Sequence, residues 1–194
     1  VTLIFVKEPE RHRESAAPRV RFQLLRDGAI ARLLALYFLV ALVFTALEGV
    51  FAVWAAEQFG LGARDVAWYL VFAGVVTVIV QGGLVGRLSQ RIGEARVAVL
   101  AVVVLFASAV ILIAVGSPIE IYLPMGLLAL GMGLNNPACQ SLLSRTAPAH
   151  LKGAVMGTAQ STQSLARIMG PAWAGWAFGA LGPEIPFIIA GAIL

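Results

Sequence analysis

The sequence predicts an all-α integral membrane protein, folded as a bundle of six helices of which the last is truncated. Three observations predict this class. Hydrophobic residues make up 60% of the 194 residues and charged residues 12%, whereas soluble domains carry about 25% charge. The mean hydropathy is +0.90. The apolar residues form long continuous runs instead of alternating with polar ones, which indicates spanning helices and not the strands of a barrel.

Each spanning helix is expected where a long apolar stretch carries at most one charge. A helix needs about 20 residues to cross the hydrocarbon core of a bilayer. Five stretches meet this length and a sixth is cut short: 33–56, 66–86, 97–119, 121–144, 153–183 and 186–194. Glu48 is the one charge in the first stretch and Arg167 the one charge in the fifth. Together these stretches define a transmembrane bundle over residues 33–194.

The segment ahead of the bundle is different in composition. Residues 1–6 are apolar and resemble the tail of a preceding transmembrane helix. Residues 7–32 are basic and contain two prolines, which is typical of a linker. Within that linker, residues 19–26 have the pattern of a short amphipathic helix on an anionic membrane surface, and a solvated linker is the alternative.

The loop charges predict the orientation of the chain. Lys and Arg accumulate on the cytoplasmic side of short loops. Twelve of them fall in the linker and in the second and fourth connections, whereas the other connections contain only Arg64. We therefore expect a multi-pass protein of the cell membrane, inner or plasma, with the linker 7–32 in the cytoplasm.

Two charged residues inside the spans are the first functional candidates, because a charge in lipid is costly unless it faces a cavity or a partner. Glu48 could bind a proton or attract a cation, or it could lie near the interface paired with a neighbour. Arg167 shares a helix face with Gln163 and has Gln160 nearby. Since Glu48 is expected at a different depth, Arg167 is predicted to meet a group outside this chain or an aqueous cavity, with a clamp to backbone carbonyls as the alternative.

The fourth span contains a second group of polar residues. Asn135, Asn136 and Gln140 surround Pro137, which removes a helix donor and tends to kink or unwind the preceding turn. Broken helices of this kind mark binding sites in transporters, although the asparagines could simply brace the bend.

Other classes of function find little support in the sequence. The phosphate-binding loop, zinc-protease and serine-hydrolase motifs are absent, and the spans contain one acid, so we expect no enzyme, no cofactor and no metal site. Cys139 is alone, which excludes an intrachain disulfide. The basic residues lie in short clusters between apolar runs, which indicates a lipid bilayer and not nucleic acid as the partner.

One connection carries a recognisable motif. Residues 86–93, GRLSQRIG, resemble the G-x-L-x-D-R-x-G signature of the major facilitator superfamily, which lies at the cytoplasmic turn between the second and third helices of each six-helix half. Gly86, Arg87, Arg91 and Gly93 match it, and Gln90 replaces the typical acid. Residues 51–60 resemble the seventh helix of tetracycline-efflux-like and multidrug-efflux-like members, and residues 153–175 resemble the eleventh.

The resemblance implies that the chain is the C-terminal half of such a transporter, helices seven to twelve, and that its partner is a missing N-terminal six-helix half. In that family the seventh and tenth helices line the substrate cavity, which makes cavity candidates of Glu48, Phe51, Asn135 and Gln140. The eighth and eleventh helices face the other half, so Arg167, with Gln160 and Gln163, becomes an interdomain candidate.

The function that this resemblance implies is secondary active transport. We expect efflux of a small hydrophobic drug-like or metabolite compound, with protons as the possible coupling ion. The alternative is a self-contained six-span membrane protein with a scaffold or assembly role.

Overall fold

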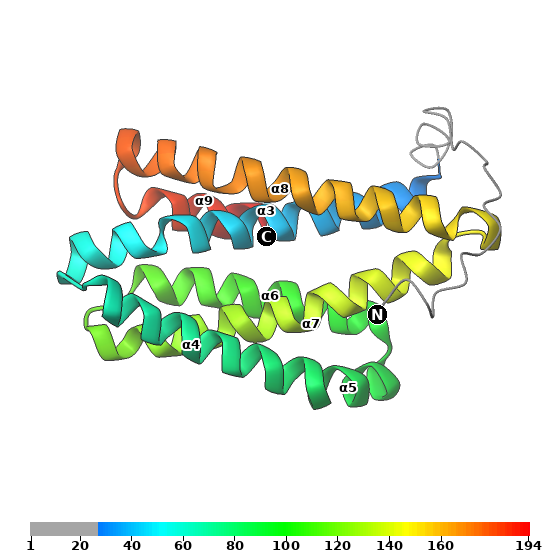
Figure 1. Cartoon of the computed structure of the whole chain (residues 1–194), viewed down its shortest axis with the longest axis horizontal. Coiled ribbons are helices and arrows are strands. Elements are labelled where there is room, and N and C mark those ends of the chain that lie inside the picture. Colours follow the sequence, from blue (N-terminus) through cyan, green and yellow to red (C-terminus); the bar gives the residue numbers. More distant parts are fainter. Residues whose placement is uncertain (1–26) are drawn as a thin grey trace, which may run out of the picture.

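The computed structural model describes residues 27–194, and within them it is helical with short connections (Figure 1). The predicted all-α class is confirmed. The second predicted span is divided into α4, a π-helical turn and α5. The third predicted span, 97–119, is too long at its end, because α6 ends at Ile113. Each of the others corresponds to a single helix. The bounds are α3 Gly28–Phe59, α4 Ala63–Ile79, π-helical turn Val80–Leu84, α5 Val85–Ile92, α6 Glu94–Ile113, α7 Tyr122–Thr146, α8 Lys152–Leu181 and α9 Ile185–Ile193. Short 3-10 turns at Pro118–Ile121 and Ala149–Leu151 precede α7 and α8.

Local signals explain where the first helices begin and end. The Asp27 carboxylate accepts a hydrogen bond from the Ala29 N–H at 3.0 Å and caps the start of α3. Gly60 ends α3 with a φ of +66°, and Gly93 separates α5 from α6 with a φ of +84°. The predicted linker 7–32 is therefore too long at its end, because residues 28–32 belong to α3. The rest of that linker, with the tail 1–6 and the amphipathic segment 19–26, lies outside the described residues.

The helices form two groups that pack face to face. In Figure 1, α3, α8 and α9 lie on one side of the bundle, and α4, α6 and α7 lie on the other. The most extensive contacts are those of α3 with α8 and of α6 with α7, while α4 packs on α7. Buried side chains of both groups fill the space between them in two main clusters, one toward each end of the bundle.

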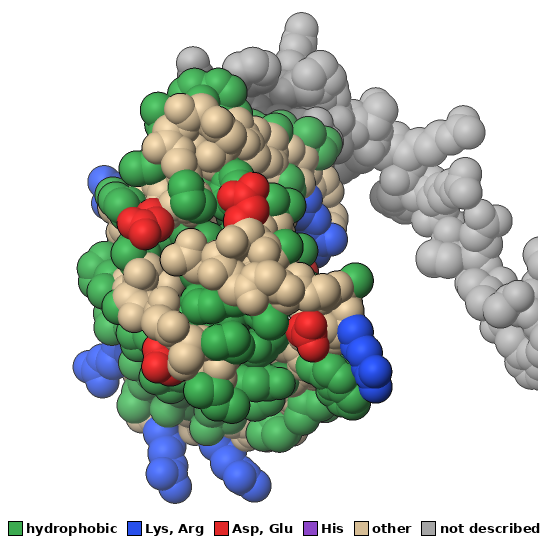
Figure 2. Space-filling model, turned by 90° about the vertical axis from the view of Figure 1, so that its left-hand side faces the viewer, with side chains coloured by type: hydrophobic (Ala, Val, Ile, Leu, Met, Phe, Trp, Pro, Cys, Tyr) green, Lys and Arg blue, Asp and Glu red, His purple; other side chains and the backbone are tan. Residues whose placement is uncertain are grey.

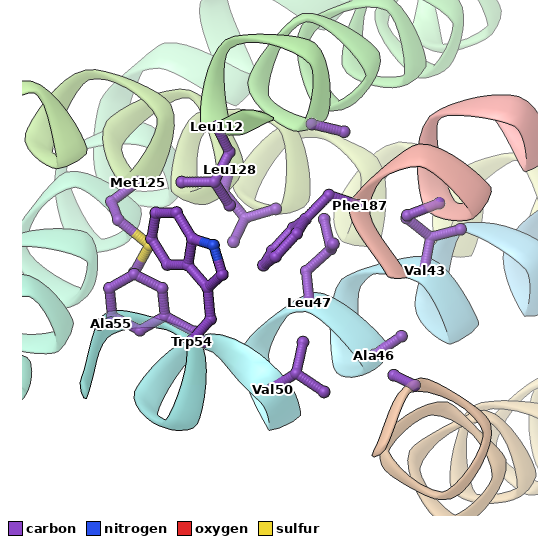
Figure 3. Packing of buried hydrophobic residues seen from close by; sticks show 14 of the residues in the cluster. Val43, Ala46, Leu47, Val50, Trp54, Ala55, Leu112, Met125, Leu128 and Phe187 are labelled. Atoms are coloured by element: carbon purple, nitrogen blue, oxygen red, sulfur yellow. The ribbon is translucent and has the colours of Figure 1, made fainter. Parts of the chain in front are cut away.

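Trp54 joins the two groups near the end of α3. Its side chain is 3% exposed and meets the Phe187 ring of α9 edge-on at a centroid distance of 5.3 Å. Figure 3 shows the indole between Phe187 and the Met125 side chain of α7, with Leu128 of α7 close by. Burial of an aromatic ring of this size makes a large apolar contribution to packing, so this cluster fixes α9 against α3 and α7.

Within residues 27–194, three helical segments are long and apolar enough to cross a membrane: Gly28–Phe59, Ala63–Ile92 and Glu94–Ile113. Their outer faces carry large apolar side chains such as Val78 and Val99, which are 71% and 64% exposed. The helices α7 and α8 have 25 and 30 residues, which at 1.5 Å per residue is more than the roughly 30 Å of the hydrocarbon core. Their glycines and amides lower their hydropathy, and their assignment as spans stays a prediction.

The interruption expected in the fourth span is not found there. Helix α7 continues through Pro137 to Thr146, so the prediction of an unwound turn before this proline is wrong for the structure. Pro137 removes only one backbone N–H donor from the helix. The helix continues through it because contacts with α6 and α4 hold the residues on both sides. The irregular backbone lies instead at Val80–Leu84.

The two ends of the bundle differ in charge. One end, hereafter the acidic end, carries four carboxylates and Arg64, and Figure 2 shows acidic side chains spread over this face. The carboxylates are Glu57, Asp65, Glu120 and Glu184. The Gly116 N–H donates to Glu120 at 2.9 Å, and this bond lowers the pKa of the Glu120 carboxyl.

The opposite end, hereafter the basic end, carries Arg87, Arg91, Arg96, Arg145 and Lys152. Arg145 at the end of α7 forms a 2.9 Å ion pair with Glu94 at the start of α6. The Ser141 hydroxyl donates to the same carboxylate at 3.0 Å. These contacts join the basic ends of α6 and α7.

Candidate functional site

A cavity of about 380 Å³ lies between α3, α4, α7 and α8, with Leu112 of α6 at its edge. Most of its wall is apolar. The larger apolar side chains are Phe44, Leu47, Phe51, Leu70, Leu112, Met125, Leu128 and Met132. The polar side chains are Glu48, Thr77, Gln81, Asn136 and Arg167. Apolar walls with a few polar groups are typical of sites for small organic molecules.

A second hollow of about 560 Å³ adjoins this cavity between α3 and α8. It is lined by Thr45, Gln163 and Pro171 among others, and it shares Phe44, Glu48, Met132 and Arg167 with the first cavity. Glu48 and Arg167 therefore face both spaces.

Close contact between α3 and α8 sets the position of Glu48. The Thr45 hydroxyl lies 2.8 Å from the Ala41 carbonyl oxygen of its own helix and 3.1 Å from the Ala166 carbonyl oxygen of α8, and its one hydrogen is shared between them. One turn later, a Cβ on Gly49 would lie 2.9 Å from the Pro171 Cβ, so the backbones approach closely. Glu48 lies between these two contacts and is thus level with residues 166–171 of α8. The prediction that Glu48 and Arg167 lie at different depths is wrong, because α3 and α8 run parallel with Thr45 opposite Ala166.

Glu48 and Arg167 are nevertheless not paired with each other. Within residues 27–194 neither makes an ion pair of 4.0 Å or less, and both side chains are exposed. A carboxylate and a guanidinium at one level of an apolar cavity can each bind an opposite charge or a hydrogen-bonding group. The cavity thus offers both signs of charge to whatever enters it.

The amides of α7 divide between the core and the cavity. Asn135 is fully buried, and its Oδ1 accepts a hydrogen bond from the Cys139 Sγ at 3.3 Å. Gln140 donates from Nε2 to the Tyr37 hydroxyl at 3.3 Å. Neither residue lines the two cavities, whereas Asn136 lines the first. The structure therefore separates the predicted cavity candidates: Glu48 and Phe51 face the cavity, and Asn135 and Gln140 do not.

The packing of α7 on α6 separates Asn135 from Asn136. Asn135 follows Gly131 by four residues and so shares its helix face, and a Cβ on Gly131 would lie 2.6 Å from the Leu105 Cγ of α6. Asn136 follows Met132 by four residues, and both line the cavity. The glycine that packs on α6 thus marks the face that points away from the cavity.

On α8, Gln163, Arg167 and Pro171 follow one another at intervals of four residues and line the second hollow. Gln163 is 5% exposed and donates from Nε2 to the Asn136 Oδ1 at 2.9 Å. Gln160 is exposed and lies outside both cavities. This arrangement links α8 to α7 beside Arg167.

Two polar residues of the second span were not predicted as cavity residues. Thr77 and Gln81, four residues apart, continue the stripe of α4 that lines the cavity. A glutamine before two glycines is equally typical of contact between helices, so the sequence alone does not select it.

The turn motif lies elsewhere, at the basic end. Gly86, Arg87 and Arg91 are within α5, and Gly93 alone makes the turn into α6.

Comparisons with known proteins agree with this architecture. The profile of the Major Facilitator Superfamily matches residues 1–171. The chain is 29% identical over 157 residues to a protein of Bacillus subtilis (strain 168) named multidrug resistance protein 2, which covers 81% of this chain and 39% of that protein.

Two tetracycline resistance proteins are also similar. The class G protein of Vibrio anguillarum is 28% identical over 197 residues, covering 89% of this chain and 49% of that protein. The class H protein of Pasteurella multocida is 23% identical over 138 residues, covering 71% of this chain and 34% of that protein. The chain therefore spans less than half the length of these relatives. Since the family profile covers most of its residues, the chain is a membrane protein that belongs to the Major Facilitator Superfamily.

Proposed function

We propose that this chain forms the C-terminal six-helix half of a secondary active transporter that exports hydrophobic drug-like or metabolite compounds in exchange for protons. The names of the relatives, which concern multidrug and tetracycline resistance, support export of such compounds. The fraction of those relatives that the chain spans supports its being one half of a larger transporter.

The observation that carries this proposal is the cavity between α3, α4, α7 and α8. Its volume of about 380 Å³ falls within the range of roughly 300 to 1,000 Å³ typical of small-molecule sites. Phe44, Leu47, Phe51 and Met125 supply apolar surface to the body of a substrate. Glu48 supplies a negative charge to a cationic group, and Arg167 supplies a positive charge.

Transport in this proposal proceeds by alternating access. The bundle rocks against an N-terminal bundle around a site near the middle of the membrane. In this mechanism Arg167 and Gln160, which are exposed on α8, face the other half. In this orientation the basic end lies in the cytoplasm and the acidic end outside the plasma membrane.

Glu48 is the proposed exchange site for the proton. A carboxyl group that faces an apolar cavity can bind either a proton or a cationic substrate, but not both at once. Such competition couples the two fluxes in opposite directions. Arg167 lies at the same level and favours the charged form of any acid that approaches it from the other half.

The test is uptake of tetraphenylphosphonium into everted membrane vesicles that contain the full-length protein, with a proton gradient as the driving force. Glu48→Gln keeps the size of the side chain and removes its charge. We expect a loss of uptake of roughly tenfold or more, because the variant removes the attraction between the carboxylate and the phosphonium cation. Glu57→Gln is the matched control, because Glu57 lies on the same helix at the acidic end, outside the cavity. Equal uptake by wild type and Glu48→Gln would contradict the role of Glu48.

A further inference from the structure

The second span, from α4 to α5, changes from α-helical to π-helical geometry at one point. Between α4 and α5, residues Val80–Leu84 form a π-helical turn, in which the Val85 N–H donates to the carbonyl of Val80, five residues earlier. Turns of this kind are rare and are concentrated at functional sites. Gly82 and Gly83 lie within it, and a Cβ on either would meet no heavy atom of residues 27–194 within 4 Å. Close packing within these residues therefore does not explain the two glycines.

The π-helical turn changes which face of the span is buried. Val80 is 3% exposed, and in a regular α-helix Leu84 would share its face. Leu84 is instead 42% exposed, and Val85 is buried at 8%. The additional residue in the turn rotates α5 relative to α4, so the row of residues that faces inward on α4 is not continuous with the row that faces inward on α5. The α4 stripe lines the cavity and ends at Gln81, while the α5 stripe packs Val85 into the core at the basic end.

A contact with α7 fixes the level of Gln81. A Cβ on Gly133 would lie 3.0 Å from the Val80 Cγ1, so Val80 fits against the glycine. Gln81 is the next residue along the chain, and Asn136 follows Gly133 by about one helical turn toward the basic end. Both side chains line the same cavity. They form its floor on the basic side, whereas Phe51 and Met125 lie toward the acidic end.

The hydrogen-bonding groups of Gln81 are available, whereas the Thr77 hydroxyl and the Asn136 Oδ1 already make hydrogen bonds. Gln163 donates to Asn136, and the Thr77 hydroxyl donates to the Ala73 carbonyl. Among residues 27–194, the Gln81 amide makes no hydrogen bond to the protein. The Asn136 Oδ1 is occupied by Gln163, which leaves the Asn136 NH₂ as a donor. The floor thus offers one complete amide and one additional donor, without net charge.

We propose that Gln81 contacts the substrate, and that its amide together with the Asn136 NH₂ selects compounds carrying a neutral group that both donates and accepts hydrogen bonds, such as a carboxamide. This inference rests on the proposed function, in which the cavity binds the transported compound. The apolar body of the substrate lies against the aromatic and aliphatic walls, and its neutral polar group points toward the basic end. Glu48 and Arg167 do not supply this selectivity, because they recognise charge.

The test compares two probes on the purified full-length protein: tetraphenylphosphonium and its analogue with one carboxamide on a phenyl ring. Equilibrium dialysis gives the Kd of each. Gln81→Leu removes the amide at nearly constant volume. We expect the Kd of the carboxamide analogue to rise roughly 3- to 10-fold, the effect of losing one neutral hydrogen bond, while the Kd of tetraphenylphosphonium stays within about twofold.

A control variant and the ratio of the two Kd values distinguish direct contact between Gln81 and the probe from a change in the protein structure. Gln58→Leu, at the exposed acidic end of α3, should leave both Kd values unchanged. Equal changes for the two probes in Gln81→Leu, or no change in either, would overturn the inference while leaving the proposed function intact. Failure of the wild-type protein to bind either probe would instead overturn the proposed function, and this inference with it.

Discussion

Gln163 of α8 donates a 2.9 Å hydrogen bond to Asn136 of α7, and this bond joins the two helices beside the cavity. Gln163 is almost fully buried, at 5% exposure. A buried amide that loses its partner still carries the free-energy penalty of its removal from water. The bond therefore contributes to stability, and it also favours the observed placement of α7 against α8.

A double-mutant cycle on this pair should give a coupling energy of about 0.5 to 1.5 kcal/mol, the net value of a neutral hydrogen bond. The variants are Gln163→Ala, Asn136→Ala and the combination, measured by thermal unfolding in detergent. Gln160→Ala is the control, since Gln160 is exposed and should show no coupling with Asn136→Ala. Additive effects of the two substitutions would show that the bond does not hold α7 to α8.

Gly170 lies where α8 touches the backbone of α3, so any side chain there should separate the helices. A Cβ at this position would lie 2.9 Å from the Ala46 nitrogen and 3.0 Å from the Leu42 oxygen. We expect Gly170→Ala to lower the free energy of unfolding by about 1 to 3 kcal/mol, as overpacking does. Gly175→Ala on the same helix meets no atom within 4 Å and serves as the control. A Gly170→Ala protein as stable as this control would refute the close contact.

Arg167→Ala should reduce transport without preventing membrane insertion. The guanidinium faces both cavities and forms no ion pair within residues 27–194, so its removal leaves the packing of α8 on α3 intact. The measurement is tetraphenylphosphonium uptake normalised to the amount of protein in the membrane. Arg64→Ala, in the first connection, is the control. Full activity of Arg167→Ala would favour a purely structural role as a clamp.

The orientation of the bundle can be tested by labelling single cysteines in intact cells with a maleimide that does not cross membranes. Glu184→Cys at the acidic end should react, and Arg91→Cys at the basic end should react only after the cells are broken. Replacement of Cys139 by Ala provides the background, and Cys139 is fully buried in any case. Labelling in the reverse order would place the basic end outside.

The all-α class and the positions of the helices follow from the sequence because they depend on long uncharged runs, which lipid makes obligatory. Glu48 and Phe51 lie at the cavity for a related reason, since their spacing on α3 places them on one face. Helix periodicity places the two residues on one face, and the resemblance to the superfamily implied that this face lines a cavity.

The remaining features depend on contacts between helices. Asn135 and Asn136 are adjacent, and only the packing of Gly131 against Leu105 decides which of them enters the core. The common level of Glu48 and Arg167 results from the offset between α3 and α8, which the Thr45 bond to Ala166 records. The burial of Val85 in place of Leu84 depends on the π-helical turn, which contains one more residue than a regular α-helical turn. Hydropathy does not reveal such a turn within an apolar run.

The contact of α3 with α8 has a further consequence for the proposed transport cycle. At Gly49 and Gly170 the two helices approach closely, and the side chains that fill the contact are the short Thr45 and the rigid ring of Pro171. Helices joined in this way cannot slide past each other without breaking the contact, so they move together. In the proposed transport cycle we therefore expect the spacing between the Glu48 and Arg167 backbones to stay constant, so that the substrate meets the same pattern of charge from either side of the membrane. Spin labels on the exposed residues Ala52 and Ala172 should accordingly report a constant distance with and without substrate.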